Sequence, residues 1–191
     1  GDSLQPTTVN EIVGAVLNLQ ENGGNGGGVF QEGQAEGSVE IKPYTSVDKE
    51  TDETEVVSST ATAEGAMALA EGAEAAGKRS RVFGKRCEAG EKAWDATVVG
   101  QVCESNASGN FTGGLQSKNY CAYGITYGKH LVSGDGYEES ANCPAVNLGS
   151  YNTIGGTETP EEDTRYAVGT GLTVHQKGKG AIGRYNVGYS D

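Results

Sequence analysis

Short runs of alternating apolar and polar residues fill the chain from Ala96 to its end. They read ATVVGQVC, NYCAYGITYG, CPAVNLGSYNTI, RYAVGTGLTVHQ and AIGRYNVGYSD, and Gly, Ser, Asn and Asp separate them. Alternation with a period of two, bounded by turn residues, predicts short strands. In the last two runs, KGKG is expected to form a hairpin turn. The residues expected to share a face are Tyr166, Val168, Leu172 and Val174 in one run, and Tyr185, Val187 and Tyr189 in the other.

Two more segments precede these runs. Residues 28–46 predict a strand through Val39 and Ile41 that ends at Pro43, because proline belongs at a strand end or edge. The sequence TSVDKETDETE that follows is rich in carboxylates, and we expect a solvated loop there.

An alanine-rich segment indicates a helix around residues 60–77. Glutamates lie toward its start, Lys78 and Arg79 lie at its end, and Gly77 stands where a helix cap is expected. Gly65 and Gly72 would each cost about 1 kcal/mol relative to alanine inside a helix. Such a helix would need to pack on a sheet.

The first 27 residues are interpreted as a docking arm and a glycine-rich joint. Thr8 and Glu11 have the spacing of a helix capping box, whereas alternation of apolar residues also allows a strand. ENGGNGGG then forms the flexible joint. The arm carries the apolar residues expected to dock on a neighbouring subunit: Val9, Ile12, Val13, Val16, Leu17 and Leu19.

Together these segments predict a mainly β protein. We expect an antiparallel β-sandwich or jelly-roll with one or two accessory helices. Residues 28–191 would form a single β-rich domain that contains the helix around 60–77.

Charge narrows the choice of partners. The formal net charge is −12, and residues 1–77 hold 14 Asp and Glu against two lysines, while residues 78–191 hold 12 acidic and 12 basic residues. An acidic chain repels phosphate backbones and anionic lipid. The sequence also has no apolar run near 18 residues. We therefore expect no nucleic-acid partner and no membrane insertion.

The four cysteines, Cys87, Cys103, Cys121 and Cys143, favour disulfides. None lies in a C-x-x-C pair, and no histidine has zinc-ligand spacing. Pairing of Cys87 with Cys103 and of Cys121 with Cys143 is preferred among three connectivities, with four buried thiols as the alternative. Disulfides, together with a start at Gly1 that resembles a mature product, would place the protein outside the cell.

Catalytic motifs are absent from the sequence. GDSL at residues 1–4 matches the nucleophile block of the GDSL hydrolases, with Ser3 as nucleophile, but neither His130 nor His175 has an aspartate three residues earlier. No phosphate-binding glycine loop, zinc-protease motif or calcium-binding EF-hand spacing occurs. We expect no catalytic, cofactor-binding or metal-binding residues, and no enzyme activity.

Two glycosylation sequons lie between cysteines, at Asn106 and Asn110. They weakly favour an extracellular, cell-surface glycoprotein. A basic segment, GKRSRVFGKR, is expected to meet the acidic N-terminal part of the same or a neighbouring subunit.

The sequence therefore predicts a non-catalytic extracellular structural protein. It would be the subunit of a self-assembling filament, such as a pilus, or of a surface layer, joined head to tail through its N-terminal segment into a homo-oligomer or homopolymer. The alternative is a secreted binding module or toxin-like effector that recognises a sugar or a host protein through tyrosine-rich loops.

Overall fold

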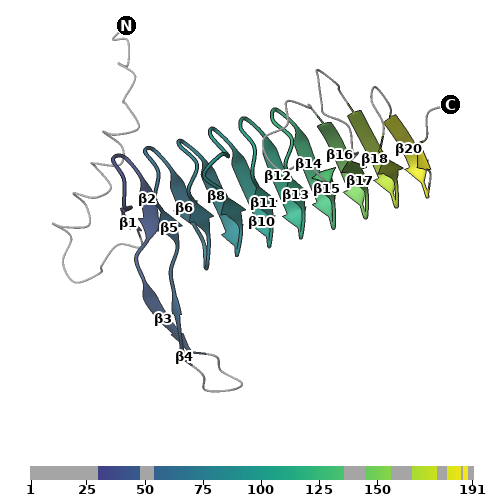
Figure 1. Cartoon of the computed structure of the whole chain (residues 1–191). Coiled ribbons are helices and arrows are strands. Elements are labelled where there is room, and N and C mark those ends of the chain that lie inside the picture. The colour runs from purple at the N-terminus through teal and green to yellow at the C-terminus, as the bar shows by residue number, and fades with distance from the viewer. Residues whose placement is uncertain are drawn as a thin grey trace, which may run out of the picture.

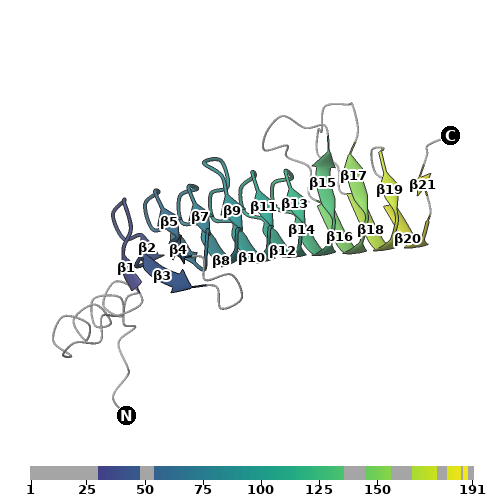
Figure 2. The same cartoon turned by 90° about the horizontal axis from the view of Figure 1, so that it is seen from below.

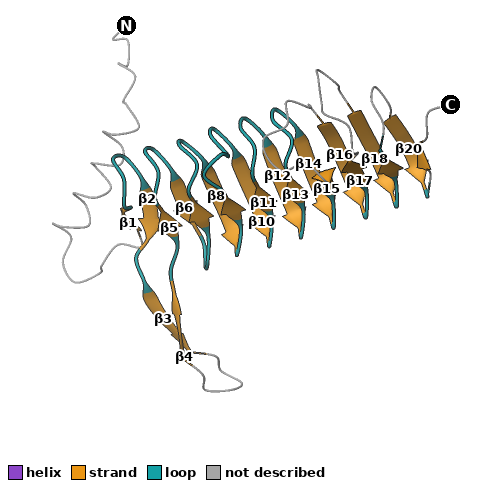
Figure 3. Cartoon of the chain, in the orientation of Figure 1, coloured by secondary structure: helices purple, strands orange, loops and turns teal. Residues whose placement is uncertain are grey.

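The computed structural model is a β-solenoid, in which the chain winds repeatedly through two facing sheets (Figures 1 and 2). It describes residues 30–47, 54–135, 145–155, 165–175, 180–185 and 187–188. From β5 onward, successive strands alternate between the two sheets, so one coil consists of one strand from each sheet and the two corners between them. Figure 3 shows the described part of the chain as strands and loops throughout.

The ten-stranded sheet, sheet A, has the order β1-β2-β6-β8-β10-β12-β14-β16-β18-β20. Its strands are β1 (Phe30–Glu32), β2 (Val39–Ile41), β6 (Met67–Leu69), β8 (Arg81–Lys85), β10 (Thr97–Gln101), β12 (Phe111–Leu115), β14 (Ile125–Lys129), β16 (Ala145–Ser150), β18 (Arg165–Thr170) and β20 (Gly180–Arg184).

The nine-stranded sheet, sheet C, has the order β21-β19-β17-β15-β13-β11-β9-β7-β5. Its strands are β5 (Thr60–Ala61), β7 (Glu74–Ala75), β9 (Glu88–Ala89), β11 (Glu104–Ser105), β13 (Lys118–Asn119), β15 (Val132–Asp135), β17 (Thr153–Gly155), β19 (Thr173–Val174) and β21 (Val187–Gly188).

A separate two-stranded hairpin of β3 (Tyr44–Val47) and β4 (Thr54–Val57) projects from the first coil (Figure 1). It occupies both ends of the segment expected to be a solvated loop, so that expectation was wrong for these strands; residues 48–53 lie outside the described residues.

The predicted antiparallel sandwich or jelly-roll with helices is wrong. Neighbouring strands are parallel throughout sheet C and in sheet A beyond the β1–β2 pair. The predicted hairpin fails in the same way, because β18 and β20 pair in parallel, with Tyr166 opposite Gly180. At the corners that the structure describes, glycine and polar residues carry the chain from one sheet into the other.

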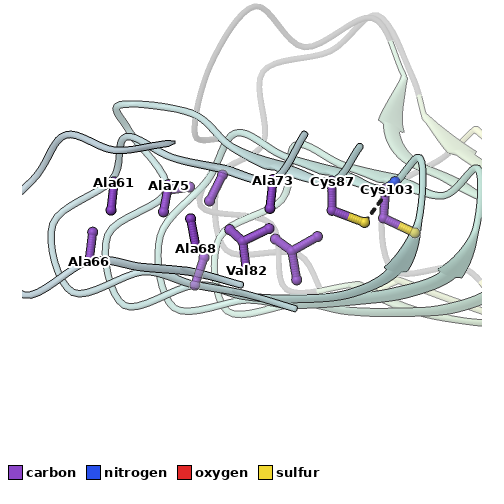
Figure 4. Close-up of a cluster of buried hydrophobic side chains, with 12 residues drawn as sticks. Ala61, Ala66, Ala68, Ala73, Ala75, Val82, Cys87 and Cys103 are labelled. Carbon is purple, nitrogen blue, oxygen red and sulfur yellow. Dashed lines mark hydrogen bonds between the residues drawn. The ribbon is translucent and has the colours of Figure 1, made fainter. Parts of the chain in front are cut away.

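The helix expected around residues 60–77 is also wrong, because this segment contains β5, β6 and β7. Ala61, Ala68 and Ala75 are fully or almost fully buried between the sheets (Figure 4). The narrow interior selects alanine for its size, and Gly65 and Gly72 take the left-handed conformation at corners, with φ of 64° and 62°. Packing thus overrides the helix propensity of alanine.

The strand predicted through Val39 and Ile41 is confirmed, since β2 ends before Pro43. The face shared by Tyr166, Val168, Leu172 and Val174 is not confirmed. Tyr166 is exposed on sheet A, whereas Leu172 and Val174 are fully buried in the interior.

The corner that leads from sheet A into sheet C has two residues in every coil from β8 onward. The first residue has left-handed φ, as at Arg86 (54°) and Val102 (56°). The second is buried. The buried column runs through Cys87, Cys103, Ser117, Leu131, Asn152 and Leu172.

The opposite corner, from sheet C into sheet A, absorbs the variation in length. It spans residues 76–80 after β7 but 90–96 after β9. Sheet A keeps its register across β14, β16 and β18, whereas the β15–β17 pair of sheet C shifts in register between Ser133 and Asp135.

The interior changes character along the axis. One hydrophobic cluster contains alanines, Val82, Val98, Cys87 and Cys103, and another contains Ile154, Leu172 and Val174. Between them the inward residues are polar and buried: Ser105, Thr112, Asn119, Thr126, Ser133 and Asn147. Several are hydrogen-bonded to one another, including the Thr126 and Ser133 hydroxyls at 2.7 Å.

Candidate interaction surface

The outer face of sheet A presents rows of side chains that run along the solenoid. Because the strands are parallel and in register, equivalent outward residues fall in line from coil to coil. The middle row is apolar, interrupted only by Gly113, over which the Tyr127 ring lies. We call it the apolar row; it consists of Leu69, Phe83, Val99, Tyr127, Leu148, Val168 and Ile182.

Exposure varies along this row, since Leu148 and Val168 are half-buried whereas Tyr127 and Ile182 are exposed. Tyr127 is 52% exposed and Ile182 is 68% exposed. A neighbouring row adds further large apolar side chains, namely Phe111, Ile125, Val146 and Tyr166. Phe111 and Tyr127 join the two rows, with ring centroids 6.0 Å apart.

The surface is also charged with one sign. The outward positions of β6–β20 carry Arg81, Lys85, Lys129 and Arg184 and no carboxylate. Lys129 places its ammonium 5.7 Å from the centroid of the Tyr151 ring.

The outer face of sheet C has the opposite sign over its first coils. Glu74, Glu88 and Glu104 stand side by side on consecutive strands. Partial burial, with the neighbouring carboxylates of Glu104 and Glu74, raises the pKa of Glu88. Lys118 ends the column with an ion pair to Glu104 at 2.7 Å. The two faces of the solenoid thus differ in both polarity and charge.

The basic segment predicted to meet the acidic N-terminal part is largely paired within the solenoid. Lys78 contacts Glu64 at 2.6 Å, and Lys85 contacts Glu71 at 2.7 Å. Arg79 donates two hydrogen bonds to Asp95, at 2.7 and 2.6 Å. Each pair joins equivalent positions on successive coils.

Two of the predicted cysteine sites lie together. Cys87 and Cys103 occupy the same buried corner position in successive coils, and both are thiols in this structure. Cys121 is buried at the other edge of sheet C, and Cys143 lies outside the described residues. The disulfide pairing stays a prediction.

The two sequons differ in their surroundings. The Asn110 side chain is buried, accepts a hydrogen bond from the Ser105 hydroxyl at 2.7 Å and donates one to the Cys121 carbonyl at 3.4 Å. A glycan on Asn110 would have to break both hydrogen bonds, and its glycosylation stays a prediction. Asn106 is partly exposed and donates to Glu104 at 2.8 Å, so its glycosylation stays a prediction.

The two histidines lie in different surroundings. His130 stacks on Tyr151 at the solenoid corner, with ring centroids 4.9 Å apart, and His175 is exposed. Among the described residues, no group of three or more His, Cys, Asp and Glu is placed to hold a metal ion. Within that same part, no helix is long and apolar enough to cross a membrane.

The docking residues predicted in the N-terminal segment, Val9 to Leu19, lie outside the described residues, as does Ser3. Sequence reasoning missed the apolar row altogether. Its signal was the repeat of glycines at Gly100, Gly114 and Gly128, each of which directly follows an outward position of the middle row, namely Val99, Gly113 and Tyr127.

Comparisons with protein-family models, with curated proteins and with solved structures find no match to this chain.

Proposed function

We propose that this protein is a non-catalytic structural subunit that self-associates by packing the outer faces of sheet A against one another. The apolar row carries this proposal. A contiguous apolar strip on an exposed sheet face marks an interaction site, because water is a poor solvent for it.

The dimensions of the strip fit an interface between copies. From β6 to β20 there are seven strand steps, which at about 4.8 Å each give a length of roughly 34 Å. Outward residues span about 13 Å across the strands, so the flat footprint is about 450 Å² per copy. The solvent-accessible area of such a face is larger than its flat footprint. The total area buried by two faces would therefore fall in the lower range of sizes of specific protein–protein interfaces.

A second copy of the chain also presents rows of side chains with the same strand-to-strand spacing as the strip. Both faces have ridges at the same strand spacing, so side chains of one copy can lie between those of the other along the whole length. The basic residues lie mainly at the margin of the face, where they stay hydrated.

This assembly is consistent with an extracellular filament or surface layer, as proposed from the sequence. In that scheme, Val9 to Leu19 of one subunit dock head to tail on the next, while sheet A joins subunits laterally. Deleting residues 1–22 separates the two contributions, since it should shorten assemblies without abolishing lateral association.

The test is the mass of the full chain in solution, measured by size-exclusion chromatography with light scattering. We expect a homo-oligomer for the wild type, a smaller assembly for Leu148→Lys, and a monomer when Leu148→Lys is combined with deletion of residues 1–22. Thr153→Lys, on β17 of the same coil but on sheet C, is the matched control and should remain oligomeric. A wild type that is monomeric at its highest soluble concentration contradicts the proposal.

A second candidate function is recognition of a sugar or host protein through exposed tyrosines. Tyr123, Tyr151 and Tyr185 are 68%, 56% and 73% exposed, although they lie at solenoid corners rather than in long loops. Binding to a glycan array that is lost in Tyr123→Ala, with the oligomer intact, would favour it.

A further inference from the structure

The buried corner column brings Cys87 and Cys103 to equivalent positions on adjacent coils. Cys87 precedes β9 and Cys103 precedes β11, and these strands pair with Glu88 opposite Glu104. Adjacent strands lie about 4.8 Å apart, which falls within the Cα separation of 4.4–6.8 Å found in disulfides.

The Cys87 side chain already contacts the backbone of Cys103. The Cys87 Sγ lies 3.4 Å from the backbone nitrogen of Cys103, which donates a hydrogen bond to it (Figure 4). The Cys103 Sγ points toward the next coil and lies 3.4 Å from the Gly114 carbonyl oxygen. Rotation of the Cys103 side chain about its Cα–Cβ bond is the main movement that would bring the sulfurs together. The neighbouring Cys87 thiol lowers the pKa of Cys103, which favours the attacking thiolate.

The geometry excludes Cys121 as a partner for either residue. The equivalent of Cys103 on the next coil is Ser117, and Cys121 lies four residues beyond it, at the far edge of sheet C. At about 3.3 Å per residue along a strand, this separation is roughly 10 Å or more, too far for a disulfide. Of the three connectivities open to the sequence, two are thereby removed.

We propose that Cys87 and Cys103 form a disulfide that ties two successive coils together when the chain folds in the presence of a small-molecule disulfide. The Cys103 thiolate attacks one sulfur of oxidised glutathione and releases one glutathione thiolate. The Cys87 thiolate then attacks the Cys103 sulfur and releases the second glutathione. The two cysteines lose two protons and two electrons, and the glutathione disulfide accepts them. This bond is independent of the proposed self-association through sheet A.

The experiment uses the full chain with Cys121→Ser and Cys143→Ser, refolded in a glutathione redox buffer, with the wild type in parallel. After denaturation and alkylation we expect no reactive thiol in the variant. Trypsin should release CEAGEK, residues 87–92, linked to the peptide of residues 93–118. The bond should raise the thermal midpoint by about 6–12 °C over the reduced protein.

Adding Cys87→Ser provides the control, which should keep one thiol and show no shift in midpoint with oxidant. Two reactive thiols in the variant after oxidative refolding would overturn the proposal. A wild-type tryptic link between Cys121 and either Cys87 or Cys103 would overturn it as well.

Discussion

Gly114 lies so close to Gly128 on the adjacent strand that a β-carbon added to Gly114 would come within 3.0 Å of the Gly128 carbonyl oxygen. The same relationship joins Gly84 to Gly100 and Gly149 to Gly169. A column of glycines therefore runs along sheet A beside the apolar row.

Gly114→Ala should destabilise the solenoid by about 3 kcal/mol or more, because the new methyl group meets backbone that cannot move alone and because φ at Gly114 is 101°. Chemical denaturation followed by circular dichroism measures the loss. Gly37→Ala is the control. The φ of Gly37 is 66°, but no atom lies within 4 Å of a β-carbon added there, so only the conformational cost of about 1–2 kcal/mol applies. Equal losses in both variants would contradict the close approach.

Val102→Asn should stabilise the protein by about 1 kcal/mol. Valine is branched at its β-carbon and is strained at φ of 56°, whereas asparagine tolerates this conformation. The free energy of unfolding reports the change. Gln116→Asn, at the equivalent corner of the next coil with φ of 54°, should gain less because glutamine is unbranched there. A loss of stability in Val102→Asn would contradict the left-handed backbone conformation of Val102.

Ala68→Leu should destabilise the protein by about 1–3 kcal/mol, since Ala68 is fully buried between the two sheets and the interior has no room for three more carbons. Met67→Leu, on the same strand but facing outward, is the matched control and should be close to neutral. Thermal unfolding of both variants distinguishes the inward from the outward position.

Glu88→Gln should stabilise the protein at neutral pH by a small amount, about 1–2 °C in thermal midpoint, since the carboxylate is partly exposed. The raised folded-state pKa means that the charged form opposes folding above that pKa. The benefit of glutamine should fade as the pH falls through the folded pKa toward the ordinary value of 4.5, where wild-type Glu88 also becomes neutral. Glu91→Gln serves as the exposed control; a gain that persists at low pH would contradict this assignment.

The strands could be predicted from sequence where alternation is strong, as at Val39 and Ile41 and from Thr97 onward. Their arrangement could not, because alternation with turn residues is equally typical of hairpins and of coils. The repeat of 14 residues, clear between Gly100, Gly114 and Gly128, is obscured by the longer intervals to Gly149 and Gly169.

The interaction surface was missed for a related reason. Tyr127, Leu148 and Val168 lie far apart in sequence and form a row only when the strands stack in parallel register. The helix was predicted around residues 60–77 because alanine is the best helix former, but alanine is also the smallest side chain that can fill a narrow apolar interior. Composition alone does not separate these two roles.

The corner of constant length has a consequence for how the molecule can change. Every added coil requires only one copy of the same tight corner and one strand in each sheet, and it extends the rod by about 4.8 Å. The opposite corner can meanwhile carry loops of any length without altering this increment. Duplication or deletion of whole coils would therefore change the length of the rod in fixed increments of about 4.8 Å, while the loops at the opposite corner could vary independently.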